Sequence, residues 1–475
     1  MKISIEGGIV ITNDPSRRII KDGSILIDGD KIVEVDKTSN KQVKYAVDKK
    51  IDAKGKVVIP GLINTHTHTF QVLTHPRVAE VIASAFNDSK VDKNMFLWYL
   101  LRKAQFPLSE ALKKEDAAAA TALACVEMVK GGITFDLDNH YGPTDKGTIM
   151  ELAKIMEKIG IRGIIARGIA PKEKPDLANK AQIPEHLFQY SEKEEIQITE
   201  ECIREVNKSE LVKVWPAPLS EMYITQEFYV KSFELAKRHG VGVHTHMEEG
   251  TADPKLYRQE YGKGPVEMLY ESGVLFPMFQ LVHGTWLSEK EIELIGKTGA
   301  TVVHNPVCNS VVFSPGIAPV REVADKGGNV SLGTDGVLHN MFDVLKMTIA
   351  LQRVKHLNPL AISWQRVFEF ATLGGATAVG LDKQIGSIEA GRKADMVIVD
   401  LKKPNLTPLP RDPTSTGITN HLILYANSTD VDTTIINGQI VVEKGVVKTI
   451  DEDSVINRAQ EVADRMAQKY IEADV

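Results

Sequence analysis

The chain has 475 residues, of which 43% are hydrophobic and 25% charged, and its formal net charge is −6. These values are typical of a globular protein, and they exclude a strongly basic surface of the kind that binds nucleic acid or anionic membranes. The length exceeds that of one ordinary domain, whereas a barrel of ~250 residues with a smaller second domain accounts for it.

The three cysteines, Cys125, Cys202 and Cys308, are an odd and sparse set, which argues against a disulfide framework and for a reducing compartment. No apolar stretch approaches the length of a transmembrane helix, and residues 1–6 lack the layout of a signal peptide. We therefore expect a cytoplasmic protein that has neither a membrane nor a nucleic acid as a partner.

The two ends of the chain have similar patterns of short strands and tight turns. Residues 9–11 and 24–27 are rich in β-branched side chains, and Asn437-Gly438 between two alternating segments predicts a hairpin. We predict that residues 1–56 and 381–450 form one small β-sandwich domain built from both termini. Residues 451–475 are expected to form a helix that packs on the body.

Between these ends, apolar β-branched runs alternate with helical patterns. The runs are residues 57–65, 134–137, 162–166, 212–217, 241–246, 280–283, 301–304 and 330–334. Strands that alternate with helices indicate a parallel sheet covered by helices, and eight such units close most simply into a barrel. The prediction is an α/β fold in which residues 57–380 form a TIM-like (β/α)8 barrel.

Histidine and aspartate occupy the predicted carboxyl ends of five of the eight strands. In parallel barrels these ends meet on one rim, where active sites lie. The residues concerned are His66 and His68 after the first strand, His244 and His246 on the fifth, His283 on the sixth, His304 and Asn305 on the seventh, and Asp335 on the eighth.

Three imidazoles and one carboxylate suit a borderline divalent ion, zinc or iron(II), with one position left for water. Such an ion lowers the pKa of water towards ~7 and supplies hydroxide at neutral pH. The reaction then needs a group that moves protons, and Glu249, three residues after His246, is the best candidate.

This arrangement resembles the amidohydrolase superfamily over almost the whole chain, from Pro60-Gly61-Leu62-Ile63-Asn64-Thr65-His66-Thr67-His68 to residues 386–395. Within it the chain is similar to the branch that contains cytosine, guanine and S-adenosylhomocysteine deaminases and triazine hydrolases such as atrazine chlorohydrolase. The resemblance implies a single metal ion bound by four residues: His66, His68, His246 and Asp335.

The resemblance also implies further roles. The His-x-x-Glu motif of the branch matches His246 to Glu249, which favours Glu249 over Glu248 as the proton carrier, and His283 would contact the attacking water or the substrate. Two-metal members carry a bridging lysine at the end of the fourth strand, but Lys213 lies near the start of that strand, which favours one metal. His244 would then lie deeper in the barrel and be structural.

Five residues are candidates for contacts with the substrate, and three of them have a structural alternative. Gln71 would either bind a heterocyclic ring or cap a loop, and Trp98 would either stack on that ring or pack inside a helix. Arg167 would bind a carboxylate or phosphate, or form a salt bridge. His304 and Asn305 are expected to line the rim.

The leading hypothesis is therefore hydrolysis at a ring carbon of a purine, pterin, pyrimidine or triazine with release of ammonia. Asp335 would act as base, His283 as electrostatic partner and Glu249 as the donor to a ring nitrogen. Alternatives are the release of chloride or an alkylamine from a triazine, and a non-catalytic scaffold that has lost its metal. Relatives often dimerise, so the resemblance implies a homodimer or a higher homo-oligomer.

Overall fold

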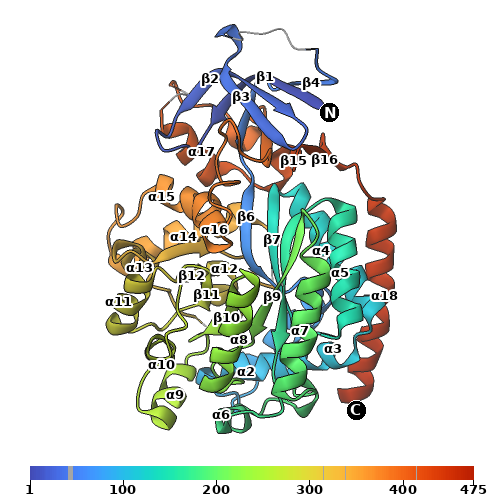
Figure 1. Cartoon of the computed structure of the whole chain (residues 1–475), viewed down its shortest axis with the longest axis vertical. Helices are drawn as coiled ribbons and strands as arrows, with labels where there is room; N and C mark the ends of the chain where they lie inside the picture. Colours follow the sequence, from blue (N-terminus) through green and yellow to red (C-terminus); the bar gives the residue numbers. More distant parts are fainter. Residues whose placement is uncertain (41–45, 314, 337, 413–414, 475) are drawn as a thin grey trace.

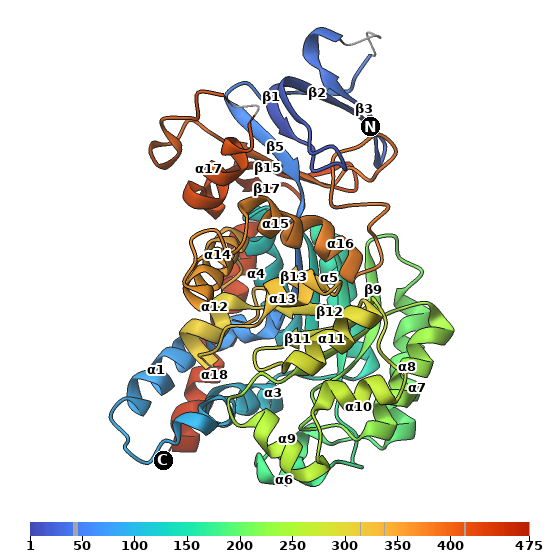
Figure 2. The ribbon, with the colours of Figure 1, turned by 90° about the vertical axis from the view of Figure 1, so that its left-hand side faces the viewer.

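A computed structural model describes residues 1–40, 46–313, 315–336, 338–412 and 415–474. The N-terminal strands and the last strands lie together at one end of the molecule, above a larger body of parallel strands and helices (Figures 1 and 2). The predicted mixed α/β fold, with a β-rich region formed from both termini, is confirmed. None of the described helices has the length and apolar character needed to cross a membrane.

The terminal region is one nine-stranded sheet. Its strand order is β17-β16-β15-β14-β5-β1-β2-β3, with β4 paired to β1. The strands are β1 (Lys2–Ile11), β2 (Ile19–Asp28), β3 (Lys31–Lys37), β4 (Lys49–Asp52), β5 (Lys56–Pro60), β14 (Met396–Asp400), β15 (Val431–Ile436), β16 (Gln439–Glu443) and β17 (Val446–Val447). The predicted hairpin joins β15 to β16, and both Asn437 (φ 51°) and Gly438 (φ 74°) have the positive φ that a tight hairpin turn requires.

Strand β5 links this sheet to the barrel. Its alternate side chains enter two different cores: Val58 packs with Ile3 and Ile5 in the core of the terminal sheet, whereas Val57 and Ile59 join the main core. The predicted run 57–65 is therefore two strands, and the predicted barrel boundary at residue 57 is wrong because residues 57–60 pair with β1 and β14.

The break falls at Gly61. A Cβ atom there would lie 2.0 Å from Oγ1 of Thr134, so only glycine permits this close approach of the chain to the next barrel strand. The chain then continues as β6 (Leu62–Thr67), the first strand of the barrel.

The barrel strands form two parallel four-stranded sheets. One contains β6, β7 (Ile133–His140), β8 (Arg162–Ile169) and β9 (Val212–Pro218), and the other contains β10 (Val243–Met247), β11 (Phe279–His283), β12 (Thr301–His304) and β13 (Asn329–Leu332). Hydrogen bonds at the carboxyl ends join the two sheets. On one side the His246 N–H donates to Leu219 O (3.0 Å), and on the other the Thr334 and Asp335 N–H groups donate to His66 O (3.1 and 2.9 Å). Both junctions therefore lie beside predicted metal ligands.

Helices cover the outside of these strands. The helices from β6 to β9 are α1 (His75–Ala85), α2 (Phe96–Leu100), α3 (Phe106–Ala111), α4 (Lys114–Lys130), α5 (Lys146–Ile159), α6 (Asp176–Lys180) and α7 (Glu192–Val206). Those that follow are α8 (Gln226–His239), α9 (Asp253–Tyr261), α10 (Pro265–Glu271), α11 (Glu289–Thr298), α12 (Pro306–Cys308), α13 (Val320–Asp325), α14 (Met341–His356), α15 (Trp364–Glu369), α16 (Gly375–Ala378) and α17 (Gly417–Tyr425). Capping boxes, such as Ser191 with Glu194 in α7, fix where these helices begin.

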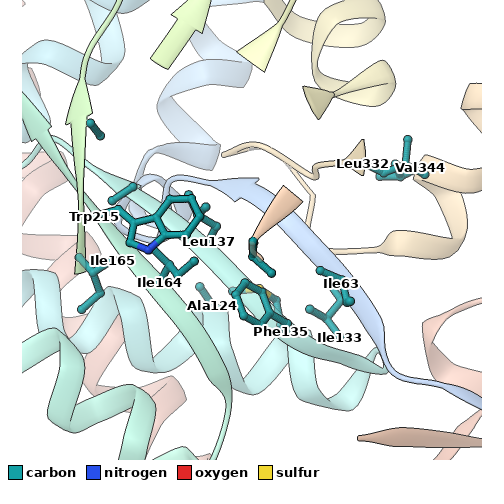
Figure 3. Packing of buried hydrophobic residues seen from close by; sticks show 14 of the residues in the cluster. Ile63, Ala124, Ile133, Phe135, Leu137, Ile164, Ile165, Trp215, Leu332 and Val344 are labelled. Atoms are coloured by element: carbon teal, nitrogen blue, oxygen red, sulfur yellow. The ribbon is translucent and has the colours of Figure 1, made fainter. Parts of the chain in front are cut away.

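The main core fills the space within and around the barrel. Figure 3 shows part of it, with Ile63 of β6, Phe135 of β7 and Trp215 of β9 among the buried side chains. The last helix, α18 (Glu452–Asp474), runs along the side of the barrel and packs on α4 (Figure 1). Arg465 and Asp116 form an ion pair across this contact. The three cysteines are buried and unpaired with one another.

Candidate metal centre and active site

The ends of β6 and β10 bring three imidazoles together at the carboxyl rim of the barrel. One ring nitrogen from each of His66, His68 and His246 lies within 4.8 Å of the others. A second such group contains His66, His283 and Asp335, so all five side chains belong to one cluster. The positions follow from topology, because the ends of parallel strands meet on the same rim.

Two of these imidazoles are oriented by the backbone. Nδ1 of His68 lies 2.6 Å from Asn139 O, and Nδ1 of His246 lies 2.8 Å from Leu219 O. Because a carbonyl oxygen only accepts hydrogen bonds, both Nδ1 atoms carry the hydrogen and both Nε2 atoms carry a lone pair. These two Nε2 atoms face each other at 3.2 Å. Two lone pairs at this distance repel each other unless a cation lies beside both.

The remaining groups complete a donor set that fits a divalent metal ion. Nε2 of His66 is buried and has no hydrogen-bond partner among the residues that the structure describes, and it lies 3.7 Å from Oδ1 of Asp335. The same carboxylate oxygen lies 3.7 Å from Nε2 of His68. Three imidazole nitrogens and one carboxylate oxygen around a common point are the ligands that zinc and iron(II) accept.

Burial sets the charge of these groups. It lowers the pKa of His68 to about 3 and that of His246 to about 4, and with the neighbouring imidazoles it holds the pKa of His66 well below its usual value. The imidazoles are therefore neutral at physiological pH, as a metal ligand must be. Burial also raises the pKa of Asp335 to about 6.

The two adjacent glutamates after β10 have different surroundings. Glu249 borders the cavity in front of the cluster, and its Oε2 lies 3.5 Å from Nε2 of His283. Burial and the nearby carboxylate of Asp335 raise the pKa of Glu249 well above its usual value. Glu248 is turned to the other side and accepts a hydrogen bond from Arg258 (3.1 Å). The geometry therefore favours Glu249 as the group that exchanges protons with a bound molecule.

The cavity in front of the cluster is lined by aromatic and apolar side chains and by acidic ones. Its lining residues are His68, Gln71, Leu97, Trp98, Leu101, Phe106, Tyr141, Leu219, Ser220, Glu221, Tyr223, His246, Glu249, Asp253 and Asp335. Two of the predicted substrate contacts, Gln71 and Trp98, are among them. Gln71 donates to Tyr141 Oη (2.7 Å) and leaves its own buried Oε1 without a partner, whereas the indole N–H of Trp98 donates to Asp253 (2.9 Å).

The other predicted substrate contacts lie elsewhere. Arg167 projects from β8 towards α7, where it donates to Glu195 (2.6 Å) and Thr199 (2.9 Å). The structure therefore shows the salt bridge that was its alternative role, and Arg167 does not border the cavity. His304 and Asn305 are buried but do not border the cavity. Asn305 instead lies with its Nδ2 3.2 Å from Nδ1 of His283, which makes it a neighbour of the cluster.

Sequence reasoning missed nine of the residues that line the cavity, among them Tyr141, Glu221, Tyr223 and Asp253. Glu221 could have been identified from the sequence, because it is a carboxylate just after the end of β9, at the same rim as the other strand-end residues. Asp253 could not have been identified in this way, because its hydrogen-bond partner Trp98 is 155 residues away in the sequence.

We expect a Glu221→Gln variant to have a stability that depends less on pH. Burial and the neighbouring Asp253 raise the pKa of Glu221 to about 8, from 4.5 for an exposed glutamate. Between these values the folded protein keeps a proton that the unfolded chain has lost. The contribution to stability is therefore present at low pH and is lost as the pH rises towards 8.

Thermal unfolding of both proteins from about pH 5 to about pH 9 measures this difference. The melting temperature of the wild type should fall by roughly a few degrees relative to that of the variant as the pH rises. Parallel curves for the two proteins would show that Glu221 titrates alike in the folded and unfolded chains.

Comparisons with known proteins agree with this geometry. The model of the amidohydrolase family matches residues 57–441. The chain is 33% identical to a 5'-deoxyadenosine deaminase of Methanosarcina acetivorans, with 98% of each chain covered, and 32% identical to a 5-methylthioadenosine/S-adenosylhomocysteine deaminase of Pyrococcus horikoshii, with 96% of this chain and 99% of the relative covered.

Solved structures show the same fold at lower identity. An adenosine deaminase from Xanthomonas campestris with bound zinc superposes with a TM-score of 0.84 at 24% identity, covering 98% of each chain. Atrazine chlorohydrolase from Arthrobacter aurescens in complex with zinc gives a TM-score of 0.80 at 24% identity, covering 97% of this chain and all of that one (100%).

Proposed function

The chain belongs to the amidohydrolase family, and we propose that it is a zinc-dependent aminohydrolase that releases ammonia from the adenine ring of a nucleoside with an uncharged substituent. The chain is a hydrolase that acts on a C–N bond of an N-heterocycle, and the curated relatives are named as deaminases of 5'-deoxyadenosine and of 5-methylthioadenosine/S-adenosylhomocysteine. The observation that supports this proposal is a cluster of neutral imidazoles with one aspartate, beside a cavity that is lined by aromatic side chains and by Glu249.

In this proposal His66, His68, His246 and Asp335 hold the ion. Their ring nitrogens and carboxylate lie close together, and two buried Nε2 atoms, those of His66 and His283, have no hydrogen-bond partner among the described residues. When bound, such an ion lowers the pKa of water towards ~7 and supplies a nucleophile at neutral pH. Zinc is favoured over iron(II) because structures of the same fold contain zinc.

The protein's own groups then move protons. Burial and the nearby carboxylate of Asp335 raise the pKa of Glu249, which favours its protonated form, and from the cavity wall that carboxyl can donate a proton to a ring nitrogen of a substrate. Asp335, whose pKa is about 6, is ionised at neutral pH and can accept a proton from the attacking water. Nε2 of His283 lies between them, 3.5 Å from Glu249 and 3.7 Å from Asp335.

The cavity wall accounts for the class of substrate. Trp98, Tyr223 and Phe106 give flat apolar surfaces against which a purine ring packs. None of the described residues that line the cavity is lysine or arginine, whereas four of them carry carboxyl groups. An anionic substituent would therefore meet no basic side chain there, and burying a charge without a partner is costly.

We predict that 5'-deoxyadenosine and 5'-methylthioadenosine are deaminated with a kcat/KM at least about tenfold above that of adenosine 5'-phosphate, since one uncompensated charge costs more than ~1.4 kcal/mol. Ammonia release from zinc-loaded protein measures this directly, with aminopterins, cytosine and aminotriazines in the same panel. Release of chloride from a chlorotriazine in place of ammonia from any aminoheterocycle would support the triazine alternative. Equal turnover of the phosphate would contradict the proposed selectivity.

A further inference from the structure

His66 differs from the other two imidazoles of the centre in how its ring is oriented. His68 and His246 each place Nδ1 against a backbone carbonyl, Asn139 O and Leu219 O. Nδ1 of His66 instead lies 2.9 Å from Nε2 of His244, a side chain that the proposed chemistry does not use. The tautomer of His66 is therefore set by a side chain, and mutation can change it.

His244 is in turn oriented by Gln280 of β11. The amide Nε2 of Gln280 donates to Ala378 O at the end of α16 (2.9 Å), which turns its Oε1 towards Nδ1 of His244 (2.7 Å). Because an amide oxygen only accepts, Nδ1 of His244 carries the hydrogen and its Nε2 carries a lone pair. That lone pair accepts from Nδ1 of His66, which leaves the lone pair of His66 on Nε2, facing the cluster.

The path crosses the interior of the barrel. β6 and β10 are the first and fifth of eight strands and so lie across the barrel from each other, and the rings of His66 and His244 stack with centroids 5.1 Å apart. His66, His244 and Gln280 are all fully buried (0% exposed), so water does not compete for these hydrogen bonds. Buried polar side chains are costly unless each has a hydrogen-bond partner, and each of these three side chains has one.

We propose that Gln280 and His244 are positioning residues that fix the Nδ1–H tautomer of His66 and thereby raise the affinity of the site for its metal ion. The inference rests on the proposed function only in taking His66 as a ligand. Groups of this kind behind a metal-binding histidine typically contribute about 10- to 100-fold in metal affinity.

The chain offers a matched control. Gln352 of α14 is also fully buried, and its Nε2 also donates to a backbone carbonyl, Ala318 O, at 2.9 Å. Its Oε1 has no hydrogen-bond partner in the part of the chain that the structure describes, so it orients no described imidazole. Gln280→Met and Gln352→Met therefore each remove a buried amide that donates to a carbonyl. Only Gln280→Met also breaks the path of hydrogen bonds that leads to His66.

The experiment is competition for Zn²⁺ between the purified full-length protein and a chromophoric chelator. Gln280→Met should bind zinc about 10- to 100-fold more weakly than the wild type, whereas Gln352→Met should bind it as the wild type does. Gln280→Glu, which keeps an acceptor for His244, should recover the lost affinity. Equal losses in both methionine variants, or no loss in Gln280→Met, would overturn the proposal.

A second measurement needs no variant of Gln280 and so remains decisive if that variant does not fold. Nitrogen-15 NMR of the histidine rings in the metal-free wild type, assigned against a His66→Gln sample, distinguishes the two tautomers. We expect His66 and His244 both to carry hydrogen on Nδ1, and a hydrogen on Nε2 of either ring would overturn the inference. A wild type that binds no zinc at all would instead refute the proposed metal centre.

Discussion

A His246→Ala variant is expected to lose both its metal ion and its deaminase activity. His246 supplies one of the four proposed ligands, and its Nε2 lies 3.2 Å from that of His68. Because a four-ligand zinc site gains on the order of 10–16 kcal/mol, one ligand accounts for roughly 3 kcal/mol, or about 10²-fold or more in affinity. Elemental analysis after dialysis against a weak chelator, with ammonia release on the same sample, measures the two losses together.

His304→Ala is the control for this experiment. His304 is likewise a buried histidine at the end of a barrel strand, β12, but it does not border the cavity. The variant should retain its metal, so the comparison separates the loss of a ligand from the loss of a buried imidazole. Full zinc content in His246→Ala would show that the ion is bound by other residues.

A Glu249→Gln variant is expected to keep its metal and lose turnover by about 10²- to 10⁴-fold, which is the usual contribution of a general acid–base group. The amide has nearly the same shape as the protonated carboxyl but cannot give up a proton in the same way. Glu249 is not among the proposed ligands, and its carboxyl lies 3.5 Å from His283 at the cavity wall. Steady-state kinetics at matched zinc content provides the measurement.

The neighbouring residue provides the comparison. Glu248→Gln changes the same functional group one position earlier, where the side chain accepts from Arg258 and is turned away from the cavity. We expect this variant to fold less stably but to retain turnover. Should Glu248→Gln lose turnover while Glu249→Gln retains it, the proton carrier would be the other glutamate.

The arrangement of the strands was predictable, since the alternation of apolar runs and helical patterns specifies a parallel α/β fold. The same pattern predicted which strand ends carry histidine and aspartate, and topology alone then brings His66, His246 and Asp335 to one rim. The sequence pattern did not show that the run 57–65 forms two strands, β5 and β6, because the apolar character of the run is continuous. The strand pairing and the close approach of Gly61 to Thr134 show where the chain passes from one sheet to the other.

The surroundings of the cluster depend on contacts between distant segments. The contact of Arg167 with Glu195 joins a strand to a helix, and nothing in the local sequence of either residue specifies it. The contact of Trp98 with Asp253 is of the same kind. The role of Gln280 was invisible for another reason: its amide is oriented by a backbone carbonyl, and sequence patterns carry no information on such a group.

The most direct test of this account is to titrate metal-free protein with zinc and to follow ammonia release from 5'-deoxyadenosine at each step. The account predicts that activity rises linearly and reaches its plateau at one zinc ion per chain, because four ligands converge on a single position. Ammonia release by the metal-free protein, or no release at full zinc occupancy from any aminopurine nucleoside, would contradict it.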